Sequence, residues 1–107
     1  MNRGEIWLTQ VGKRRRPVLI LTRDEVLGVR ALVTVAEITT SMRGLAAEVR
    51  IDHEHAGLRH ESAVNCDGLH TVPQTMLTEF VGAIETATMS EVCSAIGYAL
   101  GCFASDK

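Results

Sequence analysis

The spacing of apolar residues constrains the fold of this 107-residue chain more than any other feature. Up to residue 84, apolar side chains come in short, β-branched runs that are bounded by glycine, proline or polar clusters, which is typical of strands. We expect strands at residues 5–10, 17–21, 31–38, 46–51, 62–65, 69–72 and 80–84. The run at 17–21 is continuously apolar, which indicates a central strand buried on both faces.

A helical period appears only near the end of the chain. Thr88 and Glu91 have the spacing of a capping box, which predicts that a helix starts there, and Gly101 can stop it. Apolar residues recur at helical spacings of three and four at Met89, Val92, Ile96, Leu100 and Phe103. The pattern predicts a mainly β fold, a small curled antiparallel sheet or barrel with a C-terminal helix.

The segments between the expected strands are polar. Residues 11–16 are predicted to form a loop, with Pro17 at the first position of the next strand, where its missing N–H does least harm. Residues 39–44 are predicted to form a turn, and residues 52–61 a longer loop. The length of the chain favours a single domain spanning residues 1–107.

Charge is unevenly distributed along the chain. The formal net charge is −2, which argues mildly against nucleic-acid binding. However, residues 1–50 hold nine basic and five acidic side chains, whereas residues 51–107 hold two basic and eight acidic ones. Either the fold has one cationic face and one face suited to a basic partner, or the two halves of the sequence do not correspond to faces.

Several classes of protein are disfavoured. No apolar run approaches the roughly 18 residues of a membrane span, and Arg3 and Glu5 occupy the region where a signal peptide is apolar. We therefore expect a complete cytoplasmic chain. Three cysteines without a C-x-x-C suggest neither a disulfide framework nor a zinc knuckle. His53, His55 and His60 have no further ligand at a recognised spacing, so we expect no metal and no cofactor.

Five segments in order carry a family resemblance. They are R-G-E-I-W at residues 3–7, R-P-V-L-I-L at 16–21, V-T-V-A-E-I-T-T at 33–40, E-V-R-I at 48–51, and S-A-V-N-C-D followed by L-H-T-V over 62–72. They resemble the R-G-E-I-W, R-P-V-L-V-V, V-x-V-V-P-V-T-S, E-V-x-L and S-V-V-L-C-D-Q-I-R-T-V segments of MazF/PemK-like toxins. Residues 84–100 resemble the closing strand and helix of that family, so the resemblance covers nearly the whole chain.

The resemblance implies a fold and an activity. The fold is a small SH3-like antiparallel β-barrel with a C-terminal helix, usually a homodimer. The activity is that of the toxin of a type II toxin–antitoxin system, which cleaves single-stranded RNA sequence-selectively without a metal and is inhibited by a cognate antitoxin. The catalytic pair carried over from the family is Arg16, of R-P, and Thr39, which closes the third expected strand. Two alternatives stay open: a non-enzymatic CcdB-like gyrase poison on the same fold, and an inactive binding module.

These two residue types suit the chemistry. RNA supplies its own nucleophile, the 2′-hydroxyl, and the expected products carry a 2′,3′-cyclic phosphate and a 5′-hydroxyl. The planar guanidinium of Arg16 can hold two phosphate oxygens and stabilise the charged transition state. The Thr39 hydroxyl can position the phosphate as a further donor.

Other residues are candidates for RNA binding. Basic and hydroxyl side chains are expected to contact phosphate. The basic run at residues 13–16 is either a phosphate clamp or simply a solvent-exposed loop. His70 is either a general base or a contact to phosphate or base, and Asp67 either accepts from a base edge or caps a turn. The RNA-binding candidates are Lys13, Arg14, Arg15, Thr40, Ser41, Arg43, Asp67 and His70. Trp7 is expected in the core.

The sequence departs from the family pattern in three places. The loop before R-P is short, Glu37 replaces the family proline, and D-Q-I-R becomes Asp67-Gly68-Leu69-His70. All three departures leave the catalytic pair in place. We expect them to alter which RNA sequence is preferred.

Overall fold

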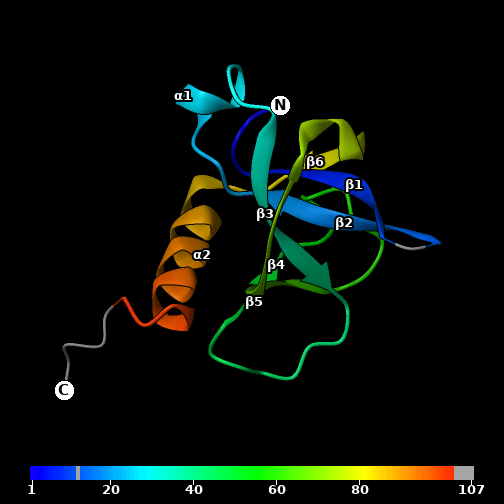
Figure 1. Cartoon of the computed structure of the whole chain (residues 1–107). Helices are drawn as coiled ribbons and strands as arrows, with labels where there is room; N and C mark the ends of the chain where they lie inside the picture. Colours follow the sequence, from blue (N-terminus) through cyan, green and yellow to red (C-terminus); the bar gives the residue numbers. More distant parts are fainter. Residues whose placement is uncertain (12, 103–107) are drawn as a thin grey trace.

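The computed structural model describes residues 1–11 and 13–102 and contains one curled sheet with two helices and a short 3₁₀ turn (Figure 1). The elements are β1 (Glu5–Val11), β2 (Arg14–Ile20), α1 (Asp24–Leu27), β3 (Leu32–Thr39), β4 (Glu48–Ile51), β5 (Ser62–Pro73), η1 (Gln74–Met76), β6 (Leu77–Ala83) and α2 (Thr86–Ala99). No helix among these residues is long and apolar enough to span a membrane.

The six strands form one antiparallel sheet in the order β4-β5-β3-β2-β1-β6. Figure 1 shows α2 lying along one side of this sheet, where it packs on β4 and β5. The predicted mainly β fold with a C-terminal helix is confirmed. In the described part of the chain β4 and β6 remain edges, so the sheet is open rather than a closed barrel.

One long strand replaces two of the expected ones. The segments 62–65 and 69–72 are the two ends of β5, not separate strands. Ala36 of β3 pairs with Leu69, yet the next residue, Glu37, pairs with Asn65, so residues 66–68 form a bulge. A bulge absorbs extra residues without ending the strand, which a linear pattern does not reveal.

β2 begins at Arg14, so the prediction of a loop through Arg16 is wrong. Antiparallel pairing with β1 extends to the turn and places Arg16 opposite Thr9. Pro17 therefore lies within the strand rather than at its start. This is tolerated because the ladder to β3 begins only at Val18, so the missing N–H of Pro17 breaks no pairing there.

α2 also starts earlier than predicted. Its N-cap is Glu85, and no side-chain capping hydrogen bond forms, so the capping box at Thr88 is wrong. The backbone has already turned by then, because the Met89 N–H donates to the Glu85 carbonyl at 2.9 Å. The end of the helix is confirmed, since Gly101 follows the C-cap with φ of +77°. Phe103 lies outside the described residues, and α1 was too short for its pattern to be recognised.

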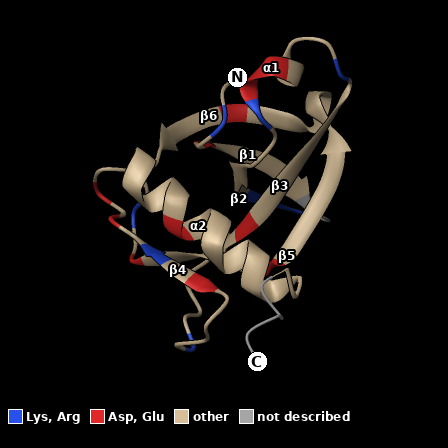
Figure 2. Cartoon of the chain, turned by 90° about the vertical axis from the view of Figure 1, so that its left-hand side faces the viewer, with Lys and Arg blue, Asp and Glu red and all other residues tan. Residues whose placement is uncertain are grey.

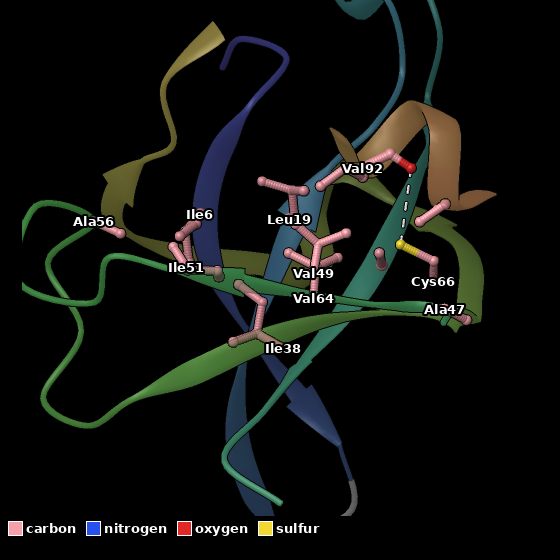
Figure 3. Packing of buried hydrophobic residues seen from close by; sticks show 12 residues of the cluster. Ile6, Leu19, Ile38, Ala47, Val49, Ile51, Ala56, Val64, Cys66 and Val92 are labelled. Carbon is pink, nitrogen blue, oxygen red and sulfur yellow. Dashed lines mark hydrogen bonds between the residues drawn. The ribbon is translucent and has the colours of Figure 1, made fainter. Parts of the chain in front are cut away.

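The main hydrophobic core lies between the sheet and α2 (Figure 3). Leu19, Val64, Cys66 and Val92 are fully buried there. The Cys66 thiol donates weakly to the Val92 carbonyl at 3.9 Å. Burial, with further contributions from Asp67 and Cys93, raises the pKa of Cys66 to about 11, so this thiol serves packing.

A second, smaller core lies on the opposite face of the sheet. It contains Val18, Ile20, Leu27, Val33, Val35 and Leu77, with Trp7 and Val72 packed against it. Neighbouring residues of a strand point to opposite faces. β2 therefore contributes Leu19 to one core and its neighbours to the other, which confirms that it is buried on both faces. Trp7 is partly buried and makes an edge contact with Phe80.

The opening R-G-E-I-W segment closes the N-terminal end of the sheet. The Arg3 Nε donates to the Leu21 carbonyl at 3.0 Å, and Gly4, with φ of +88°, donates its N–H to Ile20. The Glu5 carboxylate accepts from the Asn2 N–H at 3.0 Å and from the Trp7 indole at 2.9 Å. The segment is thus explained by folding alone.

The two halves of the sequence do not form oppositely charged faces. Arg15 pairs with Glu79 at 2.8 Å, and Arg50 pairs with Glu61 at 3.7 Å, so basic residues of the first half meet acidic residues of the second. Figure 2 shows basic and acidic positions close together along the ribbon. Of the two interpretations of the charge distribution, the structure supports the one in which sequence halves and faces are unrelated.

We predict that Gly82→Ala destabilises the fold, because an added Cβ would lie 2.0 Å from the Ala56 carbonyl oxygen. The obstacle is backbone of the 52–61 loop, which crosses β6 and cannot rotate away. The free energy of unfolding should fall by about 1–3 kcal/mol in urea denaturation. Gly28→Ala is the matched control, since nothing lies within 4 Å of its added Cβ. Equal stability of the two variants would contradict the close contact between the 52–61 loop and Gly82.

A second prediction concerns Glu5→Gln. Burial opposes ionisation of Glu5, but hydrogen bonds from the Trp7 indole and from Asn2 outweigh it and lower the pKa below 4.5. The ionised carboxylate therefore stabilises the fold above pH 4.5, and this contribution disappears as pH falls through the lower folded pKa. Urea denaturation should show the variant less stable than the original at pH 7, with the difference shrinking at pH 3. Glu25→Gln, an exposed change in α1, is the control; a pH-independent deficit would refute the assignment.

Candidate functional site

A cavity of about 350 Å³ opens on the face of the sheet that carries the second core. Val18, Val35 and Val72 give it an apolar floor. Its polar lining consists of Thr9, Gln10, Arg16, Glu37 and His70. Two sequence-predicted site residues, Arg16 and His70, therefore meet in one place, together with a carboxylate.

Strand register explains why these side chains converge. In an antiparallel sheet directly opposed residues point to the same face. Val18 of β2 is opposite Glu37 of β3, and Val35 of β3 is opposite His70 of β5. Arg16 lies two residues before Val18 and so shares its face. Three neighbouring strands thus each direct one polar side chain into the cavity.

The same register relates Arg16 to Thr39. Two residues beyond the Val18–Glu37 pair, the continuing register would bring Arg16 opposite Thr39, although the recorded ladder stops at that pair. Arg16 is exposed and Thr39, the last residue of β3, is partly buried. Thr39 is not part of the cavity lining itself. Arg16 is still paired with Thr9 of β1, and Thr39 with Ala63 of β5, so the two residues lie on adjacent strands just beyond the end of the ladder that joins these strands.

The Thr39 hydroxyl is oriented by the loop that follows it. Its oxygen accepts from the Ser41 N–H at 3.0 Å. A hydroxyl has one proton to donate and can accept at the same time. The bond to Ser41 therefore leaves the Thr39 proton available for a ligand oxygen.

His70 is hydrogen-bonded to Glu37, through Nε2 of the ring and Oε2 of the carboxylate. Both side chains are about half exposed, at 51% and 47%. Glu37 was not among the site residues predicted from the sequence, where it is only a departure from the family proline. Its position two residues before Thr39, on the same face of one strand, was the signal that could have identified it.

The bulge of β5 lies next to the Glu37–His70 pair. A Cβ added at Gly68 would lie 2.9 Å from Nδ2 of Asn65 and 3.0 Å from the carboxyl group of Glu37. A larger residue at position 68 would have to push the ends of these two side chains aside. Asp67 is exposed beside it, and its N–H donates to the Asn65 side chain at 3.1 Å.

The basic run does not form one patch. Arg15 points to the opposite face from Arg16 and reaches across β1 to β6, where it donates to Glu79 at 2.8 Å and to Thr78 at 3.2 Å. Lys13, in the turn, and Arg14 are exposed. An exposed ion pair of this kind contributes about 0–1 kcal/mol, so it orients Arg15 more than it stabilises the fold.

The loop after β3 holds the remaining candidates. Thr40, Ser41 and Arg43 are all exposed. Glu48 accepts from the Arg43 N–H at 2.9 Å and from the Leu45 N–H at 3.2 Å, and the bond from Arg43 is the main reason that the pKa of Glu48 is lowered. The ionised carboxylate thus shapes the loop through its backbone and leaves these side chains in solvent.

A larger hollow, of about 590 Å³, lies elsewhere, beside α2, and is lined by Arg3, Arg23, Arg30 and Cys93 among others. It contains none of the predicted site residues. Within the described residues no three His, Cys, Asp or Glu side chains gather in a way that could hold a metal ion.

Comparisons of the sequence place the chain beside known toxins. A family model of PemK-like, MazF-like toxins of type II toxin–antitoxin systems matches residues 2–100. The chain is 43% identical over 94 residues to Endoribonuclease MazF3 of Mycobacterium tuberculosis, covering 88% of this chain and 89% of that protein. It is 34% identical over 101 residues to Probable endoribonuclease MazF5 of the same organism, covering 94% and 93%.

Solved structures agree with the sequence comparison. The Mycobacterium tuberculosis toxin MazF-mt6 superposes with a TM-score of 0.83 at 40% identity, covering 90% of this chain and 95% of that one. A mycobacterial endoribonuclease in complex with its cognate antitoxin gives a TM-score of 0.86 at 26% identity, covering 94% and 95%.

Proposed function

Because the chain belongs to the PemK-like, MazF-like family of toxins of type II toxin–antitoxin systems, we propose that it is an endoribonuclease that cleaves single-stranded RNA without a metal ion. The observation that carries the proposal is that Arg16 and Thr39 lie on the adjacent strands β2 and β3, each two residues beyond the Val18–Glu37 pair at which their ladder ends. Relatives named as endoribonucleases, at up to 43% identity over most of the chain, support the same activity.

In the proposed reaction the 2′-hydroxyl of the RNA attacks the neighbouring phosphorus. Arg16, on the exposed part of β2, grips two non-bridging oxygens with its planar fork and stabilises the charge that develops there. Thr39 donates its free proton to the same phosphate, since its oxygen already accepts from Ser41. The products carry a 2′,3′-cyclic phosphate and a 5′-hydroxyl.

RNA binding is proposed to extend outward from this phosphate. Lys13 and Arg14 at the β1–β2 turn, and Thr40, Ser41 and Arg43 in the loop after β3, are exposed donors suited to neighbouring phosphates. Arg15 contributes only by leaving Glu79, because its guanidinium is already bound there. Asp67, on the bulge, is proposed to accept from a base edge and so to influence the preferred sequence.

We also propose two protein partners. A mycobacterial relative is known in complex with its cognate antitoxin, and we expect this chain to be inhibited by such a partner. We propose that the chain acts as a homodimer of single domains, in the cytoplasm, where its RNA substrate and antitoxin are present. The CcdB-like gyrase poison is not favoured, since the relatives described above are named as endoribonucleases or MazF toxins.

We predict that Arg16→Ala and Thr39→Ala each lower the cleavage rate by about 100–1,000-fold, as expected when one donor to a transition-state oxyanion is lost. The measurement is cleavage of a mixed-sequence single-stranded RNA in EDTA, with the ends of the fragments identified. Arg50→Ala is the matched control, because it removes an exposed arginine whose partner, Glu61, lies outside the cavity. Full cutting by both variants, with melting curves unchanged, would refute the assignment.

A further inference from the structure

We propose that Glu37 and His70 form the proton-transfer unit of this cavity, with His70 as the general base and Glu37 as the residue that positions it. The inference rests on the proposed ribonuclease function and deepens it. It identifies the group that removes the proton from the 2′-hydroxyl, a task for which Arg16 is unsuited because guanidinium stays protonated.

The location of the pair is the first argument. Glu37 comes from β3 and His70 from β5, and both line the cavity that contains Arg16. These three are the charged or titratable side chains in the lining. Exposed fractions near one half leave the pair accessible to a bound strand while the hydrogen bond between them fixes the ring. A base must be reachable and oriented at once.

The chemistry of the hydrogen bond is the second argument. An ionised carboxylate can only accept, so Nε2 of His70 carries the proton in the bond to Glu37. In the neutral ring the other nitrogen, Nδ1, then holds a lone pair. The same logic operates where a carboxylate holds a catalytic histidine in the tautomer of a base and stabilises the imidazolium that forms.

The proton balance follows from this tautomer. Nδ1 takes the proton of the 2′-hydroxyl while the O2′–P bond forms and the P–O5′ bond breaks. The departing O5′ takes a proton from solvent, and the imidazolium later returns its proton to solvent. Glu37 keeps its charge throughout and faces the positive ring in the transition state.

The bulge of β5 is the third argument. Gly68 approaches the Glu37 carboxyl so closely that a Cβ there would lie 3.0 Å from it, so the carboxylate lies between the bulge and the imidazole. The chain thus places a hydrogen-bonded carboxylate and imidazole on a sheet face whose floor is otherwise valine. Packing alone does not require such a pair at this place.

The first test is His70→Ala. We expect kcat to fall by about 100–10,000-fold, with KM within about twofold, because the base acts in the chemical step. Between pH 6 and 9 the remaining activity should rise about tenfold per pH unit, since hydroxide must replace the base, whereas the original protein should level off. Added imidazole should restore part of the rate. A rate restored selectively by RNA with a bridging 5′-sulfur would make His70 the acid and overturn its role as base.

The second test separates positioning from structure. Glu37→Gln retains an acceptor for the ring but loses the charge, so kcat should fall while the melting curve is retained. Imidazole rescue of His70→Ala should be lost in the double variant with Glu37→Gln, which a merely structural role would not cause. Glu61→Gln, which removes an exposed carboxylate paired with Arg50, is the matched control and should cut at the original rate.

The outcomes distinguish the two levels of the proposal. If the original protein leaves RNA intact, the ribonuclease function fails and this inference with it. If the original protein cuts and Arg16→Ala is inactive, but His70→Ala and Glu37→Gln cut at full rate, only the proton-transfer role is overturned. Loss of activity in His70→Ala without the steep pH dependence would likewise reject the base.

Discussion

The short ladder between β2 and β3 determines most of what this chain can do. Three opposed pairs, running from Val18–Glu37 to Ile20–Val35, join the N-terminal hairpin to the rest of the sheet. Because the side chains alternate, this register assigns Leu19 and Ala36 to the core under α2 and their neighbours to the other face. A slip of one residue would exchange both sets and turn Glu37 towards the core under α2, where burial of its carboxylate opposes the slip.

The sequence predicted the strands and the C-terminal helix, but not the short α1 or the exact points at which the elements begin and end. Alternation and β-branched runs predicted each of the six strands at least in part. Arg16 and Thr39, which were chosen from the family segments, lie on the adjacent strands β2 and β3. The spacing of Thr88 and Glu91 matches a capping box but does not mark the start of α2, because the helix has already begun after Glu85. The single strand β5 was read as two, since a bulge interrupts the pattern of a strand without interrupting its pairing.

The functional pair was harder to find for a related reason. Glu37 and His70 lie far apart in the sequence, and only the pairing of β3 with β5 brings them together. Taken alone, Glu37 was only a replacement of the family proline, and His70 could equally be a contact to phosphate. In contrast, the most recognisable segment, R-G-E-I-W, owes its residues to the closing of the sheet, as the bonds of Arg3 and Glu5 indicate. The most recognisable segment of this chain is therefore not the one that carries the proposed chemistry.

The bulge at residues 66–68 has a consequence for how the family can vary. It inserts an odd number of residues between two stretches of β5 that both pair with β3. Deleting or inserting one residue there, with three residues still bulged out, would slide the second stretch of β5 by one position against β3 and place Thr71 or Leu69 opposite Val35 instead of His70. The number of residues in this part of the chain thus determines which side chain of β5 faces the substrate. New chemistry can arise in this way while the buried framework remains unaltered.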